Sequence, residues 1–150
     1  MLPDRRVLVG RTFPPIKCVI DEETMRSYLQ VSGEDMPAYQ SEEAALAMGY
    51  DRRIIPPSYG PFLALLLRSF DWEKDFFLDY RTGTAVFGEQ TLEYLRPLYF
   101  GETLFVQGTV LDVLEKKGKK IFDVVKMKLT AKDESGSIAF HGLLDYILFK

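Results

Sequence analysis

The sequence predicts a single α+β domain, residues 1–150, in which one buried apolar helix is followed by long antiparallel strands, a pattern that permits a curved antiparallel sheet wrapped around one central apolar helix. A length of 150 residues suits one domain, and 47% hydrophobic with 27% charged residues is typical of a globular protein. The first half has helical periodicity and capping residues, whereas apolar and polar residues alternate from Thr84 onward as they do in strands. An apolar helix followed by long strands is typical of the α+β class.

The N-terminal part is expected to hold one short strand and two helices. Residues 15–20 are apolar and predict the strand. Asp21 is a suitable cap for a helix that Gly33 ends, with acidic residues in the first turn, where the helix dipole favours them. A loop follows. Ser41 is a suitable cap for a second, shorter helix, which Gly49 ends.

The central helix is expected from Tyr59 to about Phe70. Pro56 and Pro57 prevent helix before it and favour an extended approach, and Ser58 opens the helix. Its apolar residues cover most of the circumference, which indicates a helix buried on all sides.

Four strands are expected in the C-terminal half, separated by polar turns. A lysine-rich hairpin tip joins the second strand of this half to the third, and a turn at residues 133–136 precedes the last. The strands are predicted at 84–96, from residue 104 toward the tip, at 121–129 and at 138–148, and the tip at Lys116–Lys120.

Composition excludes several classes of function. A net charge of −3 and a pI of about 5.3 leave no basic face for nucleic acid. Cys18 is the single cysteine, so no internal disulfide can form and no Cys/His zinc spacing exists, which favours a reducing, cytoplasmic setting without a bound metal. No apolar run is long enough for a signal peptide or a membrane span.

Two motifs carry a resemblance to a known family. Residues 33–39 read Gly-Glu-Asp-Met-Pro-Ala-Tyr and precede an acidic short helix, a glycine and a Pro-Pro segment. This order resembles the MaoC-like hydratases, whose catalytic loop reads roughly G-D-x-N-P-x-H. Tyr94–Leu98 and Gly101–Val106 resemble the strand pair R-P-L and G-D-x-L-x-V of that family. The run from Ser41 to Asp51 is most similar to the N-terminal MaoC-like dehydratase domain, a group that includes accessory subunits of mycobacterial (3R)-hydroxyacyl-ACP dehydratases. The resemblance implies a hotdog fold.

The loop departs from the catalytic pattern at the residues that matter most. Glu34 replaces the aspartate, Met36 the asparagine and Tyr39 the histidine. Hydration of an enoyl thioester needs a carboxylate and an imidazole that together position and deprotonate water. A tyrosine, with an ordinary pKa near 10, is a poor base at neutral pH. The only histidine, His141, is expected on the last strand, where it does not fill the gap.

The first hypothesis is therefore a non-catalytic or accessory hotdog subunit of a (3R)-hydroxyacyl-CoA/ACP dehydratase, paired as a homodimer or with a catalytic MaoC-like subunit. Two alternatives stay open: an active hydratase or thioesterase that uses Glu34, and a module that binds acyl-CoA. Pro57, Tyr59 and Gly60, around the start of the predicted central helix, are candidate substrate contacts, and a place in the core is an equal alternative for Tyr59.

No cofactor is expected, because the substrate itself carries coenzyme A or an acyl carrier protein. Its phosphates could meet Arg52, Arg53 or the lysines of the hairpin tip, although such residues are equally typical of a solvated surface. Neither a nucleic acid nor a membrane is expected as a partner.

Overall fold

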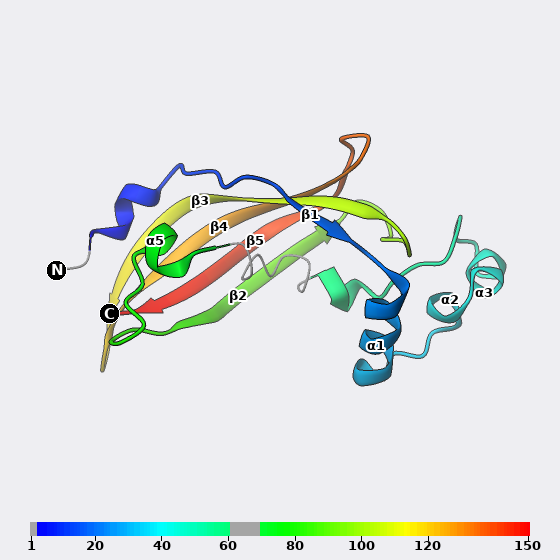
Figure 1. Ribbon diagram of the computed structural model, residues 1–150, viewed down its shortest axis with the longest axis horizontal. Helices are drawn as coiled ribbons and strands as arrows, with labels where there is room; N and C mark the ends of the chain where they lie inside the picture. The colour runs from blue at the N-terminus through cyan, green and yellow to red at the C-terminus, as the bar shows by residue number, and fades with distance from the viewer. Residues whose placement is uncertain (1–2, 61–69) are drawn as a thin grey trace.

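One strongly curved antiparallel sheet forms the body of the molecule (Figure 1). The computed structural model describes residues 3–60 and 70–150. The strand order is β1-β3-β4-β5-β2, so β1 and β2 are the edges. The expected strands are confirmed, and two of them extend further than the alternation indicated. They are β1 (Ile16–Val19), β2 (Ala85–Tyr94), β3 (Thr103–Lys117), β4 (Ile121–Asp133) and β5 (Ile138–Phe149).

The helices gather at the two ends of the sheet (Figure 1). Beyond one end lie α1 (Glu22–Ser32), α2 (Pro37–Gln40) and α3 (Glu42–Ala47). Near the other end, close to the C-terminus, lie the 3-10 turn η1 (Arg5–Leu8) and α5 (Trp72–Phe76). The sheet therefore has a helical end, which carries the 33–39 loop, and an opposite end where the chain terminates.

The predicted helix caps are confirmed at α1 and α3. Asp21 Oδ1 accepts a hydrogen bond from the Thr24 N–H (2.8 Å), and Ser41 Oγ accepts one from the Ala44 N–H (3.1 Å). Gly33 ends α1 in the left-handed conformation (φ 71°), which glycine adopts without strain. These local interactions fix where the loop begins and ends.

The structure corrects two local predictions. The expected loop before Ser41 contains the helical turn α2, because Pro37 supplies a pre-set first helical residue. Pro56 is extended as predicted, but Pro57 begins the 3-10 turn η2 (Pro57–Tyr59). Most of the predicted central helix falls at 61–69, outside the described residues.

Alternation along β5 separates an inner, buried face of the sheet from an outer face. Phe140, Leu144 and Tyr146 are buried, whereas Leu143, between the first two, is 53% exposed. Tyr94 lies opposite Phe140 in the β2–β5 register, and their ring centroids are 5.5 Å apart. The inner face at the end of β2 therefore continues directly into the core.

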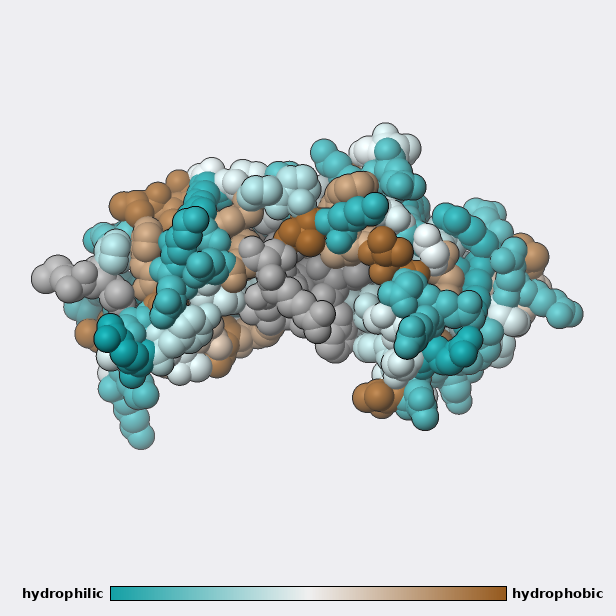
Figure 2. Space-filling model, viewed as in Figure 1, coloured by the Kyte–Doolittle hydropathy of each residue, from teal (hydrophilic) through white to brown (hydrophobic). Residues whose placement is uncertain are grey.

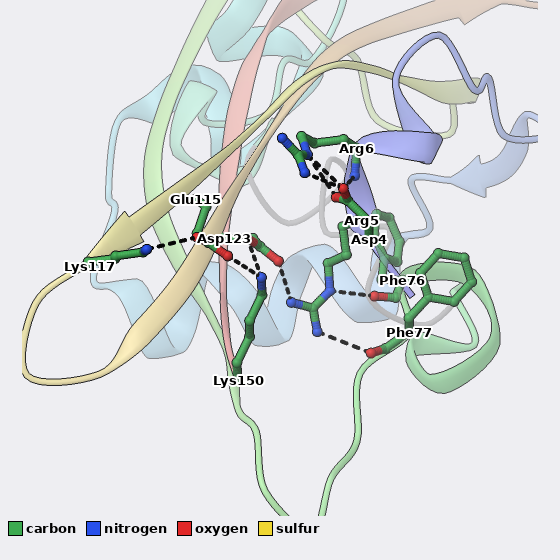
Figure 3. A network of polar contacts seen from close by, with 9 residues as sticks. All are labelled: Asp4, Arg5, Arg6, Phe76, Phe77, Glu115, Lys117, Asp123 and Lys150. Atoms are coloured by element: carbon green, nitrogen blue, oxygen red, sulfur yellow. Dashed lines mark hydrogen bonds and ion pairs between the residues drawn. The ribbon is translucent and has the colours of Figure 1, made fainter. Parts of the chain in front are cut away.

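A buried ion pair joins the N-terminus to the body of the fold (Figure 3). Arg5 and Asp123 are each 2% exposed, and Arg5 Nη1 lies 2.7 Å from Asp123 Oδ2. The same guanidinium donates to the carbonyl oxygens of Phe76 (2.7 Å) and Phe77 (3.1 Å). Lys150 Nζ lies 3.3 Å from the other oxygen of Asp123. One arginine thus connects η1, α5 and β4.

Candidate functional site

Glu34 is held in a hydrogen-bonded chain that reaches across three elements. The Ser58 hydroxyl donates to Glu34 Oε1 and itself lies 2.7 Å from the Tyr28 hydroxyl, which donates to it. Tyr28 comes from α1, Glu34 from the loop after it, and Ser58 from η2. The Ser58 hydroxyl therefore orients the carboxylate directly, and the Tyr28 hydroxyl orients Ser58 in turn.

Tyr39, at the position of the family histidine, is a buried side chain of α2, with 7% of its surface exposed. Burial raises the pKa of this phenol, and the negative charge of Glu34 and then Tyr50 raise it further. The hydroxyl is consequently neutral at physiological pH and can donate a hydrogen bond, but it cannot take a proton from water as imidazole does. The Tyr39 carbonyl is fixed by Arg53 Nε at 2.8 Å.

An apolar cavity of about 420 Å³ lies beside Tyr39. This volume falls within the usual range for small-molecule sites, and its walls are mainly aliphatic and aromatic. Met36, at the position of the family asparagine, adds to this apolar character. The cavity is formed by the α2–α3 region, the segment that leads into η2 and the end of β2; its described lining is Met36, Tyr39, Tyr50, Ile54, Ile55, Pro57 and Tyr94–Leu98.

The three predicted substrate contacts have different places in the structure. Pro57 lies on the cavity wall. Tyr59 packs edge-to-face on Tyr28, with ring centroids 4.9 Å apart. Gly60 is buried beneath Tyr94, and a methyl group built on it would overlap the Tyr94 hydroxyl. The structure thus brings Pro57 to the cavity beside Tyr39, and gives Gly60 a packing role against β2.

Sequence reasoning missed Tyr28, Ser58 and Tyr94 as components of this region. The Tyr94 hydroxyl donates to the Pro57 carbonyl, and burial raises the pKa of Tyr94 to about 12. The hydrogen-bonded pairs are far apart in sequence: Glu34 and Ser58 by 24 positions, Tyr28 and Ser58 by 30, and Pro57 and Tyr94 by 37. A pattern of neighbouring residues therefore cannot predict them.

His141 lies on the outer face of the sheet. It alternates along β5 with the fully buried Phe140, and its Nε2 is 3.6 Å from Glu93 Oε2 on β2. Phe140 and Tyr94 occupy the inner face, which leads to the cavity. The only imidazole of the chain is therefore separated from Glu34 and Tyr39 by the sheet itself.

The basic residues that were predicted to meet the substrate's phosphates divide between the two ends of the molecule. Arg52 lies over the Tyr99 ring (4.3 Å to its centroid) and Arg53 over Phe100 (3.6 Å), both near the helical end. Figure 2 shows hydrophilic side chains gathered over α1, α2 and α3 at this end. The lysine-rich tip between β3 and β4 lies at the opposite end of the sheet (Figure 1), away from the 33–39 loop.

Within residues 3–60 and 70–150, no group of three His, Cys, Asp or Glu side chains is placed to hold a metal ion. Among the helices of the same ranges, none is long and apolar enough to cross a membrane.

Comparisons with known proteins agree with this architecture. The family model described as FAS1-like, dehydratase domain region, matches residues 7–141. A UPF0336 protein of Streptomyces griseus is 30% identical over 136 residues, which cover 90% of this chain and 88% of that protein.

Solved structures support the fold independently. The C-terminally truncated HadBC (3R-hydroxyacyl-ACP dehydratase) complex from Mycobacterium tuberculosis matches with a TM-score of 0.76 and 22% identity, over 98% of this chain and 99% of that chain. An (R)-hydratase from A. caviae involved in PHA biosynthesis matches with a TM-score of 0.70 and 14% identity, over 92% and 94%. The predicted α+β hotdog fold is confirmed by these matches.

Proposed function

This chain belongs to the FAS1-like dehydratase domain family, and we propose that it is a non-catalytic, accessory subunit of a (3R)-hydroxyacyl thioester dehydratase. The observation that carries the proposal is the buried, neutral phenol of Tyr39 at the position where the catalytic loop has its histidine. Water addition to the enoyl thioester requires a group that accepts a proton near neutral pH. Tyr39 lacks that property, so a partner subunit supplies the imidazole.

The remaining polar residues of the loop support binding better than proton transfer. Glu34 already accepts the Ser58 hydroxyl, and Tyr28 donates to Ser58 in turn. This arrangement fixes the carboxylate but provides no second group that shuttles protons. His141 lies on the other face of the sheet and pairs with Glu93 instead.

The edge strand β2 is the proposed surface for the partner. Among the described residues, β2 pairs with β5 on one side, and no strand pairs with its other side. Val86 and Phe87 on this strand are 41% and 42% exposed. Pairing with an edge strand of a second hotdog subunit would satisfy the unpaired backbone groups and cover these side chains. The HadBC relative is itself a complex, which is consistent with such an assembly.

Co-expression with a hotdog subunit that carries an intact G-D-x-N-P-x-H loop tests the proposal. The isolated chain is expected to show no hydration of crotonyl-CoA, whereas the complex is expected to hydrate it. Tyr39→Phe in the complex should change the rate by less than about twofold, because the phenol transfers no proton. Replacing the partner's loop histidine with alanine should lower the rate by about 10²–10⁴-fold, the usual contribution of general acid–base catalysis.

The alternative of an active enzyme makes the opposite prediction for Glu34. If the purified chain hydrates crotonyl-CoA alone, and Glu34→Gln abolishes that turnover, the chain is a hydratase with altered residues. A stable homodimer that binds no histidine-bearing hotdog subunit would also contradict the accessory role.

The apolar cavity supports a second part of the proposal, in which this subunit holds the acyl group for the partner's active site. Saturated acyl-CoA is expected to raise the unfolding temperature of the purified chain. At a ligand concentration of about 100 times Kd, binding stabilises the folded state by about 2.7 kcal/mol. Free coenzyme A, which lacks the acyl chain, is the control and should give a clearly smaller shift. Equal shifts would place the binding energy outside the cavity.

A further inference from the structure

Tyr94 stands where the apolar cavity meets the core of the sheet. Its side chain is part of the cavity lining, at the last residue of β2. On its inner side the ring packs against Phe140, which is fully buried. The ring therefore separates the space beside Tyr39 from the interior of the fold.

Contacts with Phe140, Pro57 and Gly60 hold this ring in one position. The hydroxyl donates to the Pro57 carbonyl, so the polar tip of the phenol is satisfied by the backbone. Gly60 leaves room for the hydroxyl where any larger residue would overlap it. A side chain fixed on several sides acts as a rigid wall, because moving it breaks a hydrogen bond and a packed contact together.

We infer that Tyr94 determines the length of the acyl chain that the cavity accepts. The ligand class is a straight-chain acyl thioester, and its methylene groups lie along the apolar lining until they meet the Tyr94 ring. This inference rests on the proposed acyl-binding role of the cavity. It adds that the Tyr94 ring, which Gly60 and Pro57 hold in place, sets the limit to chain length.

Calorimetric titration with a series of saturated acyl-CoA thioesters of increasing length tests the inference. For the wild-type chain, affinity is expected to rise about fourfold for each methylene that becomes buried, and then to stop rising when the chain meets Tyr94. In Tyr94→Ala the rise should continue to longer chains. Two further buried methylenes would give about a 16-fold gain over wild type for the longest ligand.

Two matched variants distinguish the effect of the Tyr94 ring on chain length from a general loss of affinity. Tyr94→Phe removes the hydrogen bond to Pro57 but keeps the ring and its packing against Phe140, so it should retain the wild-type length limit. Leu95→Ala shortens a neighbouring lining residue that is 53% exposed. This variant should lower the affinity for all acyl-CoA ligands by a similar factor and leave the length limit unchanged. Thermal unfolding checks that each variant folds, and Tyr94→Leu replaces Tyr94→Ala if the alanine variant does not.

The outcomes distinguish this inference from the function on which it rests. If the wild-type chain binds acyl-CoA and the length limit is the same in Tyr94→Ala, Tyr94 is not the determinant, whereas acyl binding stands. If the wild-type chain binds no acyl-CoA of any length, the acyl-binding role fails and the inference fails with it.

Discussion

Replacing Arg5 with methionine is expected to lower the free energy of unfolding by about 3–5 kcal/mol, the usual cost of removing one partner of a buried ion pair. Methionine has a similar length but no donor. The carboxylate of Asp123 and the carbonyls of Phe76 and Phe77 would each lose a hydrogen bond while they stay buried (Figure 3). Because Lys150 remains near Asp123, the lower end of this range is expected.

The neighbouring arginine provides a matched control. The Arg6 side chain is 75% exposed and pairs with Asp4 at the surface, so Arg6→Met should leave the free energy of unfolding close to that of the wild-type chain. Urea denaturation of both variants measures the difference. The double variant Arg5→Met/Asp123→Leu should recover part of the loss, since it removes the stranded charge. Equal stability of the two single variants would show that the Arg5–Asp123 pair contributes little.

Interactions between residues close in sequence were predictable here, whereas the long-range contacts of Arg5 were not. Strands and helix caps depend on residues a few positions apart, and so β1, β2 and the Asp21 cap were predictable from periodicity and capping chemistry. Arg5 pairs with a residue 118 positions away. In sequence it is one of two adjacent arginines near the N-terminus, where a solvated side chain is the usual expectation.

The candidate site divides in the same way. The motif around residues 33–39 predicted a loop, whose second half is the helical turn α2 beside the cavity, and the identity of Tyr39 was sufficient to question catalysis. The partners of that loop were not predictable, because Ser58 and Tyr94 reach it through contacts made only in the folded chain. Gly60 illustrates the difference, since nothing in the sequence indicated that this candidate substrate contact packs against the Tyr94 ring.

Gly142→Ala is expected to destabilise the chain by about 1–3 kcal/mol through overpacking. Gly142 lies on β5 opposite Leu92 of β2. A methyl group built on it would overlap the carbonyl oxygen of Thr91 and lie 2.8 Å from Leu92 Cδ2. Since the first of these atoms belongs to the backbone, it cannot rotate away as a side chain does. The variant must therefore displace β2 from β5.

Displacement of β2 makes this variant a test of the partner surface as well as of packing. If the accessory role uses the β2 edge, Gly142→Ala should lower affinity for the histidine-bearing subunit together with stability. Gly118→Ala at the β3–β4 tip is the control, because its new methyl group would meet no heavy atom closer than 3.9 Å. In Gly118→Ala, stability and affinity for the histidine-bearing subunit should both stay near the wild-type values. A Gly142→Ala chain that is less stable but binds the partner with unchanged affinity would mean that the partner docks on a surface other than β2, since an edge strand shifted away from its neighbour cannot present the same row of backbone groups.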